Sequence, residues 1–182
     1  MRLIETYIDD LLILKSDQFV DDRGSFSRVY CQEELLKLTD QKIAQINISN
    51  TSKKGTLRGL HIQKKPFHEI KIIQCIKGSV YDVALDMRKE SKTFLKSNGI
   101  KLSSKDNLAY FIPAGFAHGF QALEDDCSLL YFHTNFYSKN HESGFLYNDS
   151  AFDINWPLNP INLSNRDQSF NPITNNFKGY KI

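Results

Sequence analysis

The sequence predicts an all-β protein, an antiparallel jelly roll or barrel with a few short helices. Short alternating or apolar segments recur along the chain, and turn residues separate them, as is typical of antiparallel barrels. Only one helix is convincing, over 32–38, where Glu33 and Glu34 suit the first turn. The 182 residues, 41% of them hydrophobic, are enough for one core. Residues 1–182 are therefore expected to form a single domain.

The expected strands follow one another closely from the N-terminal part of the chain to residue 133. They cover 11–14, 26–30, 44–48, 55–63, 71–76, 79–87, 100–102, 108–112, 119–123 and 128–133. Lys77-Gly78 has the spacing of a tight hairpin between two of these strands. Beyond Asn135 the chain is rich in loop residues, so a docked C-terminal segment with a helical turn is expected there rather than a second domain.

Composition excludes several functional classes. The net charge is +2, and basic and acidic residues are interspersed, so no strong field favours nucleic acid or an anionic membrane. The apolar runs are too short for a signal peptide or a membrane span. Cys31, Cys75 and Cys127 have neither metal-binding spacing nor the pattern of a disulfide framework. A reducing, cytoplasmic location is expected.

A histidine occupies the middle of the strand expected at 55–63. Alternation places Leu60 and Ile62 on one face of this strand and His61 and Gln63 on the other. Two glycines in so short a strand indicate that a backbone or a ligand approaches closely. Taken alone, His61 is more often a core residue bonded to a carbonyl than a catalytic group.

The strand expected at 79–87 also has two unlike faces. Its apolar row contrasts with a second face that carries Asp82, Ala84 and Asp86. Carboxylates along a strand usually face solvent, but in a small barrel the same pattern can line a polar pocket.

The segment 113–118 resembles the second half of the cupin signature, Pro-x-Gly-x-x-His, and ends at His118. In metal-binding cupins this histidine joins a His-x-His pair and a glutamate from the first half. That first half is missing here, because six residues separate His61 from His68, and Glu69 directly follows His68. The resemblance therefore implies a cupin-type jelly roll, whereas no metal is expected.

Several further motifs, in the same order along most of the chain, resemble the dTDP-4-dehydrorhamnose 3,5-epimerase family. They are Arg58-Gly59-Leu60-His61, Lys71 in Glu-Ile-Lys-Ile-Ile-Gln-Cys, 81–88, 112–120, Tyr131, Trp156-Pro157 and 163–167. The resemblance implies an enzyme that inverts carbons beside the keto group of a nucleotide-linked 4-keto-6-deoxyhexose, in deoxysugar biosynthesis. No cofactor is expected. The implied partners are this sugar nucleotide and a second copy of the chain.

The resemblance also implies the roles of individual residues. His61 is the expected general base, and Asp167 orients it and stabilises its imidazolium form. Tyr131 is the expected acid on the opposite face of the sugar, and Lys71 holds the enolate oxygen. Predicted substrate-binding residues are Arg58, Arg23, Gln45, Asn47, Gln63, His118 and Phe26. Of these, Arg23 matches a residue that reaches the nucleotide of a neighbouring subunit.

The chain departs from the family pattern where the nucleotide and the sugar are expected to bind. Ile46 and Ile48 occupy positions where an acidic residue and a histidine are common in the family. Arg28 occupies the position of a usual glutamate, and Phe136 replaces a tyrosine. The nucleotide (dTDP, CDP or GDP) and the number of inverted centres therefore stay open. Two other functional classes also stay open: a metal-dependent cupin oxygenase or isomerase, and a non-catalytic protein that binds sugar nucleotides.

Overall fold

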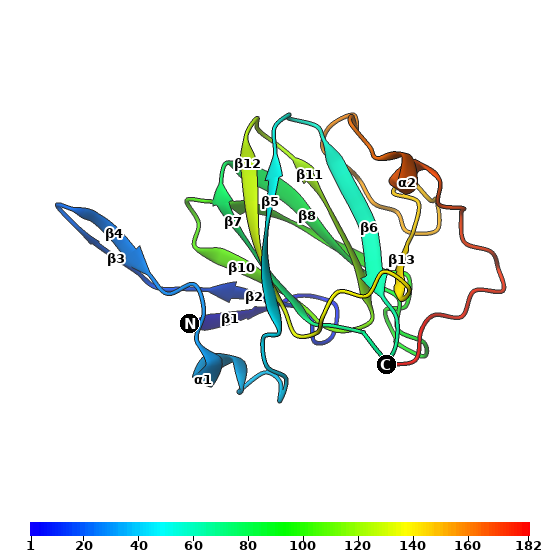
Figure 1. Cartoon of the computed structure of the whole chain (residues 1–182), viewed down its shortest axis with the longest axis horizontal. Coiled ribbons are helices and arrows are strands. Elements are labelled where there is room, and N and C mark those ends of the chain that lie inside the picture. Colours follow the sequence, from blue (N-terminus) through cyan, green and yellow to red (C-terminus); the bar gives the residue numbers. More distant parts are fainter.

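Two antiparallel sheets lie face to face in the computed structural model, which describes residues 1–182 (Figure 1). The six-stranded sheet has the order β1 (Arg2–Glu5), β2 (Leu12–Lys15), β10 (Leu108–Ile112), β7 (Lys71–Lys77), β12 (Cys127–His133), β5 (Gln45–Thr51). The five-stranded sheet has the order β13 (Glu142–Gly144), β6 (Leu57–Gln63), β11 (Phe116–Ala122), β8 (Ser79–Asp86), β9 (Ser97–Ser103). The predicted all-β, antiparallel class is confirmed.

The main core fills the space between the two sheets. Its fully buried side chains come from alternate positions of strands on both sides, for example Ile73 and Leu129 from one sheet and Val80 and Phe120 from the other. This alternation is the period of two that the sequence shows. Burying one such side chain stabilises the fold by about 1.5–3 kcal/mol.

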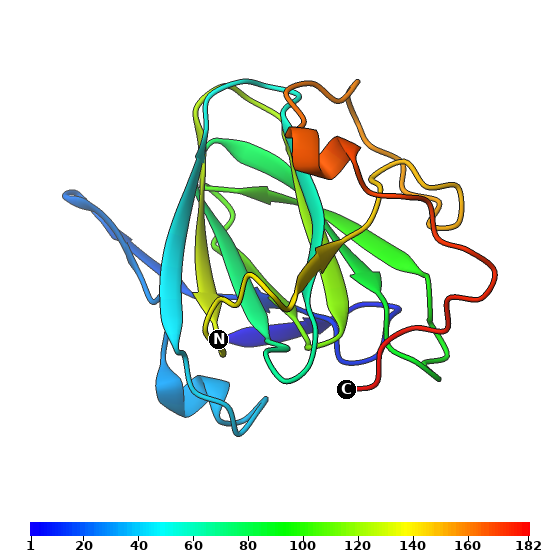
Figure 2. The same ribbon diagram turned by 45° about the vertical axis from the view of Figure 1, so that its right-hand side comes forward.

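A second apolar layer covers the outer face of the five-stranded sheet. Val83, Leu85 and Met87, from the apolar row of β8 and the residue after it, pack against Phe145 and Phe152 of the C-terminal segment. Figure 2 shows this segment running along the outside of the barrel. The other face of β8 consequently points into the barrel, and its Asp82 is fully buried. Asp82 therefore faces the barrel interior and not solvent, behind the pocket residue His118 to which it is bonded.

The two helices are single turns. α1 (Gln32–Leu35) is shorter than the predicted 32–38, and the chain continues from it as a turn. α2 (Asn165–Gln168) is the expected C-terminal helical turn, and the Ser164 hydroxyl accepts a hydrogen bond from Asp167 N at its start. Neither helix has the length or apolar character needed to cross a membrane. The cytoplasmic location and the single-domain boundary stay predictions.

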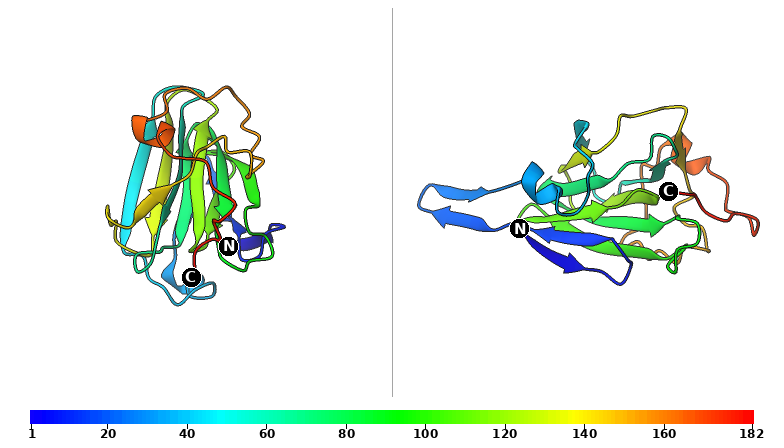
Figure 3. Two further views of the ribbon diagram at one scale, coloured as in Figure 1. Left: turned by 90° about the vertical axis from the view of Figure 1, so that its right-hand side faces the viewer. Right: turned by 90° about the horizontal axis from the view of Figure 1, so that it is seen from below.

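A two-stranded hairpin leaves the barrel near the N-terminus. It consists of β3 (Gln18–Asp21) and β4 (Gly24–Ser27), and both Figure 1 and Figure 3 show it projecting away from the two sheets. The predicted strand from Phe26 therefore ends early, at Ser27. Strands β1, β3 and β13 were not predicted, because each has only three or four residues of uniform exposure, so none shows a clear alternation.

Candidate active site

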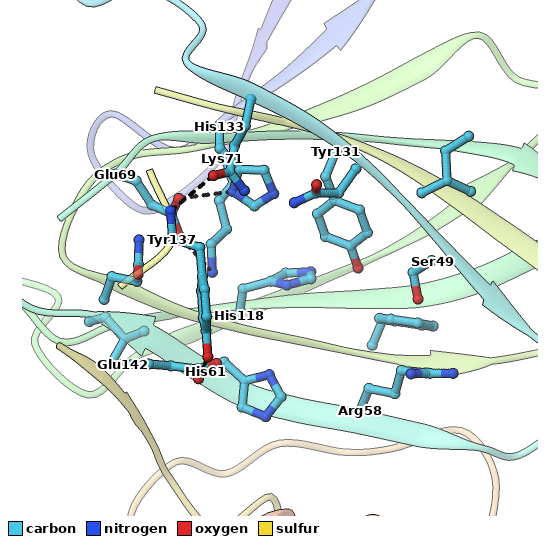
Figure 4. A pocket seen from close by; sticks show the side chains of 16 residues that line it. Ser49, Arg58, His61, Glu69, Lys71, His118, Tyr131, His133, Tyr137 and Glu142 are labelled. Atoms are coloured by element: carbon cyan, nitrogen blue, oxygen red, sulfur yellow. Dashed lines mark hydrogen bonds and ion pairs between the residues drawn. The ribbon is translucent and has the colours of Figure 1, made fainter. Parts of the chain in front are cut away.

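A pocket of about 300 Å³ opens between β5 and β6 and reaches the barrel interior (Figure 4). Its walls come from both sheets. The lining residues are Gln45, Asn47, Ile48, Ser49, Arg58, His61, Ile62, Gln63, Glu69, Lys71, His118, Phe120, Tyr131, His133, Tyr137 and Glu142. Most are polar, although they line a barrel whose deeper interior is apolar. Such a concentration of convergent polar groups is typical of a binding site for a small polar ligand.

A bulge in β6 brings Arg58 and His61 to the same wall. His61 pairs with His118 of β11 and Arg58 pairs with Phe120, so three steps along β6 match two along β11. Paired residues point to the same side of a sheet, and so do residues two apart. Arg58 and His61 therefore both face the pocket, which simple alternation along β6 does not predict.

The His61 ring is held by a carboxylate from the C-terminal segment. Nε2 of His61 lies 2.7 Å from Oδ1 of Asp167, and Asp167 Oδ2 accepts a hydrogen bond from Gly59 N. Burial raises the pKa of Asp167, but the hydrogen bonds from His61, Gly59 and Ser164 outweigh it and leave this pKa below its usual value. Because an ionised carboxylate only accepts, Nε2 carries a proton, and Nδ1 is the ring nitrogen that does not contact Asp167.

Tyr131 faces His61 from the other sheet. It lies on β12, and its ring is perpendicular to that of His118, with 5.8 Å between centroids. Burial and the nearby Asp82 raise the pKa of Tyr131 well above its usual value, although Arg58 opposes this. The hydroxyl therefore keeps its proton at neutral pH. The predicted base and acid thus stand on opposite walls of one pocket.

Lys71 lies beside a carboxylate and a third histidine. Its Nζ is 3.6 Å from Oε1 of Glu69, whose Oε2 lies 2.9 Å from Nδ1 of His133 (Figure 4). All three side chains are largely buried and line the pocket. Lys71 of β7 and His133 of β12 are direct cross-strand partners.

His118 forms the floor of the pocket with Asp82. Nε2 of His118 lies 2.9 Å from Oδ1 of Asp82, and both residues are buried. Burial lowers the pKa of His118 more than the neighbouring Asp82 raises it, and Lys71 and His61 lower it further. His118 is accordingly a neutral hydrogen-bonding group.

The polar residues predicted to bind substrate differ in how many hydrogen bonds they already make within the protein. Arg58 donates to Asn50 O and Thr51 Oγ1, which fixes the guanidinium at the pocket wall. Asn47 pairs with Tyr131 across β5 and β12, and it lines the pocket together with Gln45. The Gln45 amide also accepts a hydrogen bond from Tyr137 N.

Gln63 lines the pocket, but its amide is fully used by the protein. The nitrogen donates to Phe67 O and Phe136 O, and the oxygen accepts from Ser138 N. Its position indicates that it supports the loop at 136–138.

The structure does not bring Arg23 and Phe26 to the pocket of their own chain. Both lie on the β3–β4 hairpin, where the Arg23 side chain is 90% exposed and Phe26 is 72% exposed. The Arg23 guanidinium pairs with Asp21 of the same hairpin.

Four ionisable residues of the pocket are absent from the predicted site: Glu69, His133, Tyr137 and Glu142. For His133 a signal existed, because it shares the parity of Tyr131 along β12. Nothing near Glu142 marks it in the sequence. Across the whole chain no three His, Cys, Asp or Glu side chains are grouped so that they could hold a metal ion.

Comparison with known proteins identifies the family. The family model described as dTDP-4-dehydrorhamnose 3,5-epimerase matches residues 5–175. The chain belongs to this family. A dTDP-4-dehydrorhamnose 3,5-epimerase from Shigella flexneri is 41% identical over 169 residues, which cover 92% of this chain and 93% of the relative. The cupin-type fold and the assignment to nucleotide-sugar epimerases of deoxysugar biosynthesis are thereby confirmed.

Solved structures of dTDP-sugar 3,5-epimerases superpose closely on this chain. The Bacillus anthracis enzyme, crystallised with TDP and PPi, has a TM-score of 0.91 and 38% identity, covering 94% of this chain and 99% of its own. A Legionella pneumophila epimerase in complex with dTDP-4-keto-L-rhamnose has a TM-score of 0.89 and 34% identity. The match covers 93% of this chain and 90% of the Legionella chain.

Proposed function

We propose that this epimerase inverts C3 and C5 of a dTDP-linked 4-keto-6-deoxyhexose. The observation that carries the proposal is the placement of His61, tied to Asp167, and Tyr131 on opposite walls of one pocket, with Lys71 beside them. Inversion at carbon needs a base on one side of the sugar and an acid on the other. The Legionella relative supports the choice of nucleotide and sugar, since it was crystallised with dTDP-4-keto-L-rhamnose.

Proton removal is the first step. The C4 ketone acidifies the hydrogens on C3 and C5, because the electron pair left on carbon delocalises onto the ketone oxygen. Nδ1 of His61 takes the proton, and Asp167 stabilises the imidazolium that forms. The Lys71 ammonium faces the oxygen on which negative charge develops. This interaction is stronger in the transition state than with the ketone, so it accelerates the step.

Reprotonation from the opposite wall completes the inversion. Tyr131 retains its proton at neutral pH, because burial raises its pKa. An enolate carbon is basic enough to take this proton, after which His61 returns its own proton to solvent or to the phenolate. The second centre repeats the cycle once the sugar has turned in the pocket.

The remaining pocket residues bind the substrate in this proposal. Arg58, at the wall of the pocket and already oriented by β5, binds a diphosphate oxygen. Gln45 and Asn47 bind sugar hydroxyls, and His118 forms the neutral floor.

We also propose a homodimer in which the β3–β4 hairpin of one protomer completes the pocket of the other. The hairpin exposes Phe19, Val20 and Phe26, and an isolated two-stranded hairpin is only marginally stable in water, so a partner that covers these side chains would stabilise it. Its Arg23, exposed to solvent and paired only with Asp21 of the same hairpin, would then meet the partner's nucleotide. Mixing Arg23→Ala and His61→Asn variants tests this, since hybrids regain one intact site. A monomeric active enzyme contradicts it.

One experiment tests the reaction and the nucleotide together. The protein is incubated with dTDP-, CDP- and GDP-linked 4-keto-6-deoxyhexoses in deuterated water, and label at C3 and C5 is followed by NMR. We expect exchange and inversion at both carbons with the dTDP sugar. Label at C5 alone limits the enzyme to one centre, and preference for another nucleotide corrects the substrate. Binding without exchange identifies a non-catalytic protein.

A further inference from the structure

Glu69 and His133 form a buried pair that the proton transfers do not use. Nδ1 of His133 lies 2.9 Å from Oε2 of Glu69. With the carboxylate ionised, Nδ1 is the donor, because a carboxylate only accepts. The imidazole also lies parallel to the Tyr131 ring, with 5.8 Å between centroids and 9° between planes. The His133 ring is thus fixed on one side by a carboxylate and on another by the proposed acid.

The other oxygen of Glu69 faces the Lys71 ammonium but accepts no hydrogen bond from it. Oε1 is 3.6 Å from Nζ, which is close enough for an ion pair but beyond hydrogen-bond distance, and the ammonium donates no hydrogen bond to the protein. A negative charge at this distance offsets part of the cost of burying the ammonium. All three N–H groups nevertheless stay available to a ligand in the pocket.

The hydrogen bond to His133 explains why the Glu69 carboxylate does not come within hydrogen-bond distance of Lys71. A glutamate free to turn next to a lysine forms a shorter, charge-assisted hydrogen bond, because that contact is about twice as strong as a neutral one. The hydrogen bond from His133 holds Glu69 back through its second oxygen. Without it, Glu69 turns toward Lys71, and the ammonium moves away from the developing enolate oxygen.

We propose that Glu69 and His133 are positioning residues for Lys71. His133 fixes Glu69, and Glu69 sets the place and direction of the ammonium that stabilises the enolate. This inference rests on the proposed function, because it assumes that Lys71 faces the C4 oxygen. It adds two residues that act through Lys71 and do not touch the substrate's reacting atoms.

Two substitutions at His133 separate positioning from packing. His133→Phe keeps a ring against Tyr131 but removes the donor, whereas His133→Asn places an amide N–H near the position of Nδ1. With dTDP-4-keto-6-deoxyglucose in deuterated water, we expect His133→Phe to lower kcat for exchange about tenfold and to leave KM within about twofold. His133→Asn should recover most of this loss. Equal activity of His133→Phe and wild type overturns the proposal.

A double-mutant cycle tests whether the effect passes through Lys71. In a Lys71→Ala background there is no ammonium to misplace, so His133→Phe should change the exchange rate by less than about twofold. The same tenfold loss in both backgrounds overturns the positioning role and indicates packing alone. If His133→Phe does not fold, as judged by circular dichroism, Glu69→Ala replaces it, with the same expected loss and the same cycle. Absence of exchange with wild type overturns the proposed reaction itself.

Discussion

Of the three histidine–carboxylate pairs in the barrel, those of His61 and His118 differ mainly in their contact with solvent. His61 lies 2.7 Å from Asp167, and His118 lies 2.9 Å from Asp82. The side chain of His61 is 31% exposed, whereas that of His118 is 6% exposed. His61 belongs to the edge of the pocket, while His118 belongs to its floor.

The comparison teaches that the hydrogen bond alone does not make a histidine a base. Burial lowers the pKa of His118 despite the nearby carboxylate, so protonation there places a charge in the barrel interior. At His61 the partner Asp167 has a lowered pKa, and one side of the ring is open to the pocket. The two similar pairs therefore differ in environment, and the proposed function assigns proton transfer to the exposed one.

The largest expected effect comes from removing the base. His61→Asn should leave the fold intact and lower turnover by about three orders of magnitude, because only binding and electrostatic stabilisation remain. His118→Asn is the matched control, and we expect it to lose about tenfold or less. Steady-state kinetics on both variants, with melting curves to verify folding, make the measurement. Equal losses would remove the distinction between the two pairs.

Tyr131→Phe should lower inversion by about two orders of magnitude while hydrogen exchange continues. The enolate still forms, because deprotonation needs only His61, Asp167 and Lys71. With no donor on the far wall, His61 reprotonates the carbon and returns the starting configuration. In deuterated water, label should therefore appear at C5 or C3 faster than inverted product. Inversion at the wild-type rate would assign the acid to another group.

Asp167→Asn should lower turnover about tenfold, less than His61→Asn, because the imidazole stays in the pocket. The amide supports the imidazolium form less well than the carboxylate does. Comparison of kcat for Asp167→Asn and His61→Asn measures the difference. A loss as large as that of His61→Asn would show that orientation of the ring matters as much as its presence.

The buried His118–Asp82 pair should affect the free energy of unfolding rather than the reaction rate. Because the pKa of His118 is lower in the folded protein than its ordinary value of 6.5, the unfolded chain binds more protons as the pH falls below 6.5. Between pH 7 and pH 5 the wild type should therefore lose stability, by at most about 1.4 kcal/mol per pH unit from this group. Urea unfolding of His118→Gln should show a shallower dependence on pH. An unchanged slope would contradict the buried, neutral state of His118.

The smallest expected effect is that of chelation. The pocket has histidines on three strands but no group of ligands suited to a metal ion, so EDTA treatment should leave activity within about twofold of the untreated enzyme. Loss of activity that one divalent ion restores would favour the metal-dependent cupin interpretation instead.

Much of the barrel could be predicted because its strands alternate cleanly. The period of two identified the two faces of β8, but only the structure shows that the face of Asp82 points inside. Alternation could not predict the face of Arg58, because the bulge in β6 adds a residue that only the pairing with β11 reveals. Glu142 escaped prediction for another reason. It reaches the pocket through a short strand, β13, whose position depends on its partner β6.

The pocket residues likewise divide into those that alternation along a strand could predict and those that only the folded chain places. His61, Lys71 and Tyr131 lie on strands, so parity together with the family motifs could place them in one pocket. Glu69 precedes β7 and lies in a loop, where no period applies. Its role depends on the distances to two side chains that are far apart in sequence, and these distances exist only in the folded chain.

The extra residue in β6 limits how the enzyme can be redesigned or can diverge. A single backbone insertion sets Arg58 and His61 relative to each other, so a shift of register displaces both together. Variation in substrate range has to come from elements that leave β6 unchanged. Ile46 and Ile48 on edge strand β5, together with Arg28 beside the hairpin, are exposed and meet this condition. Libraries at these positions can alter the pocket wall at Ile48 and its surroundings on β5, and the exposed base of the hairpin at Arg28, while the proposed proton-transfer residues keep their places.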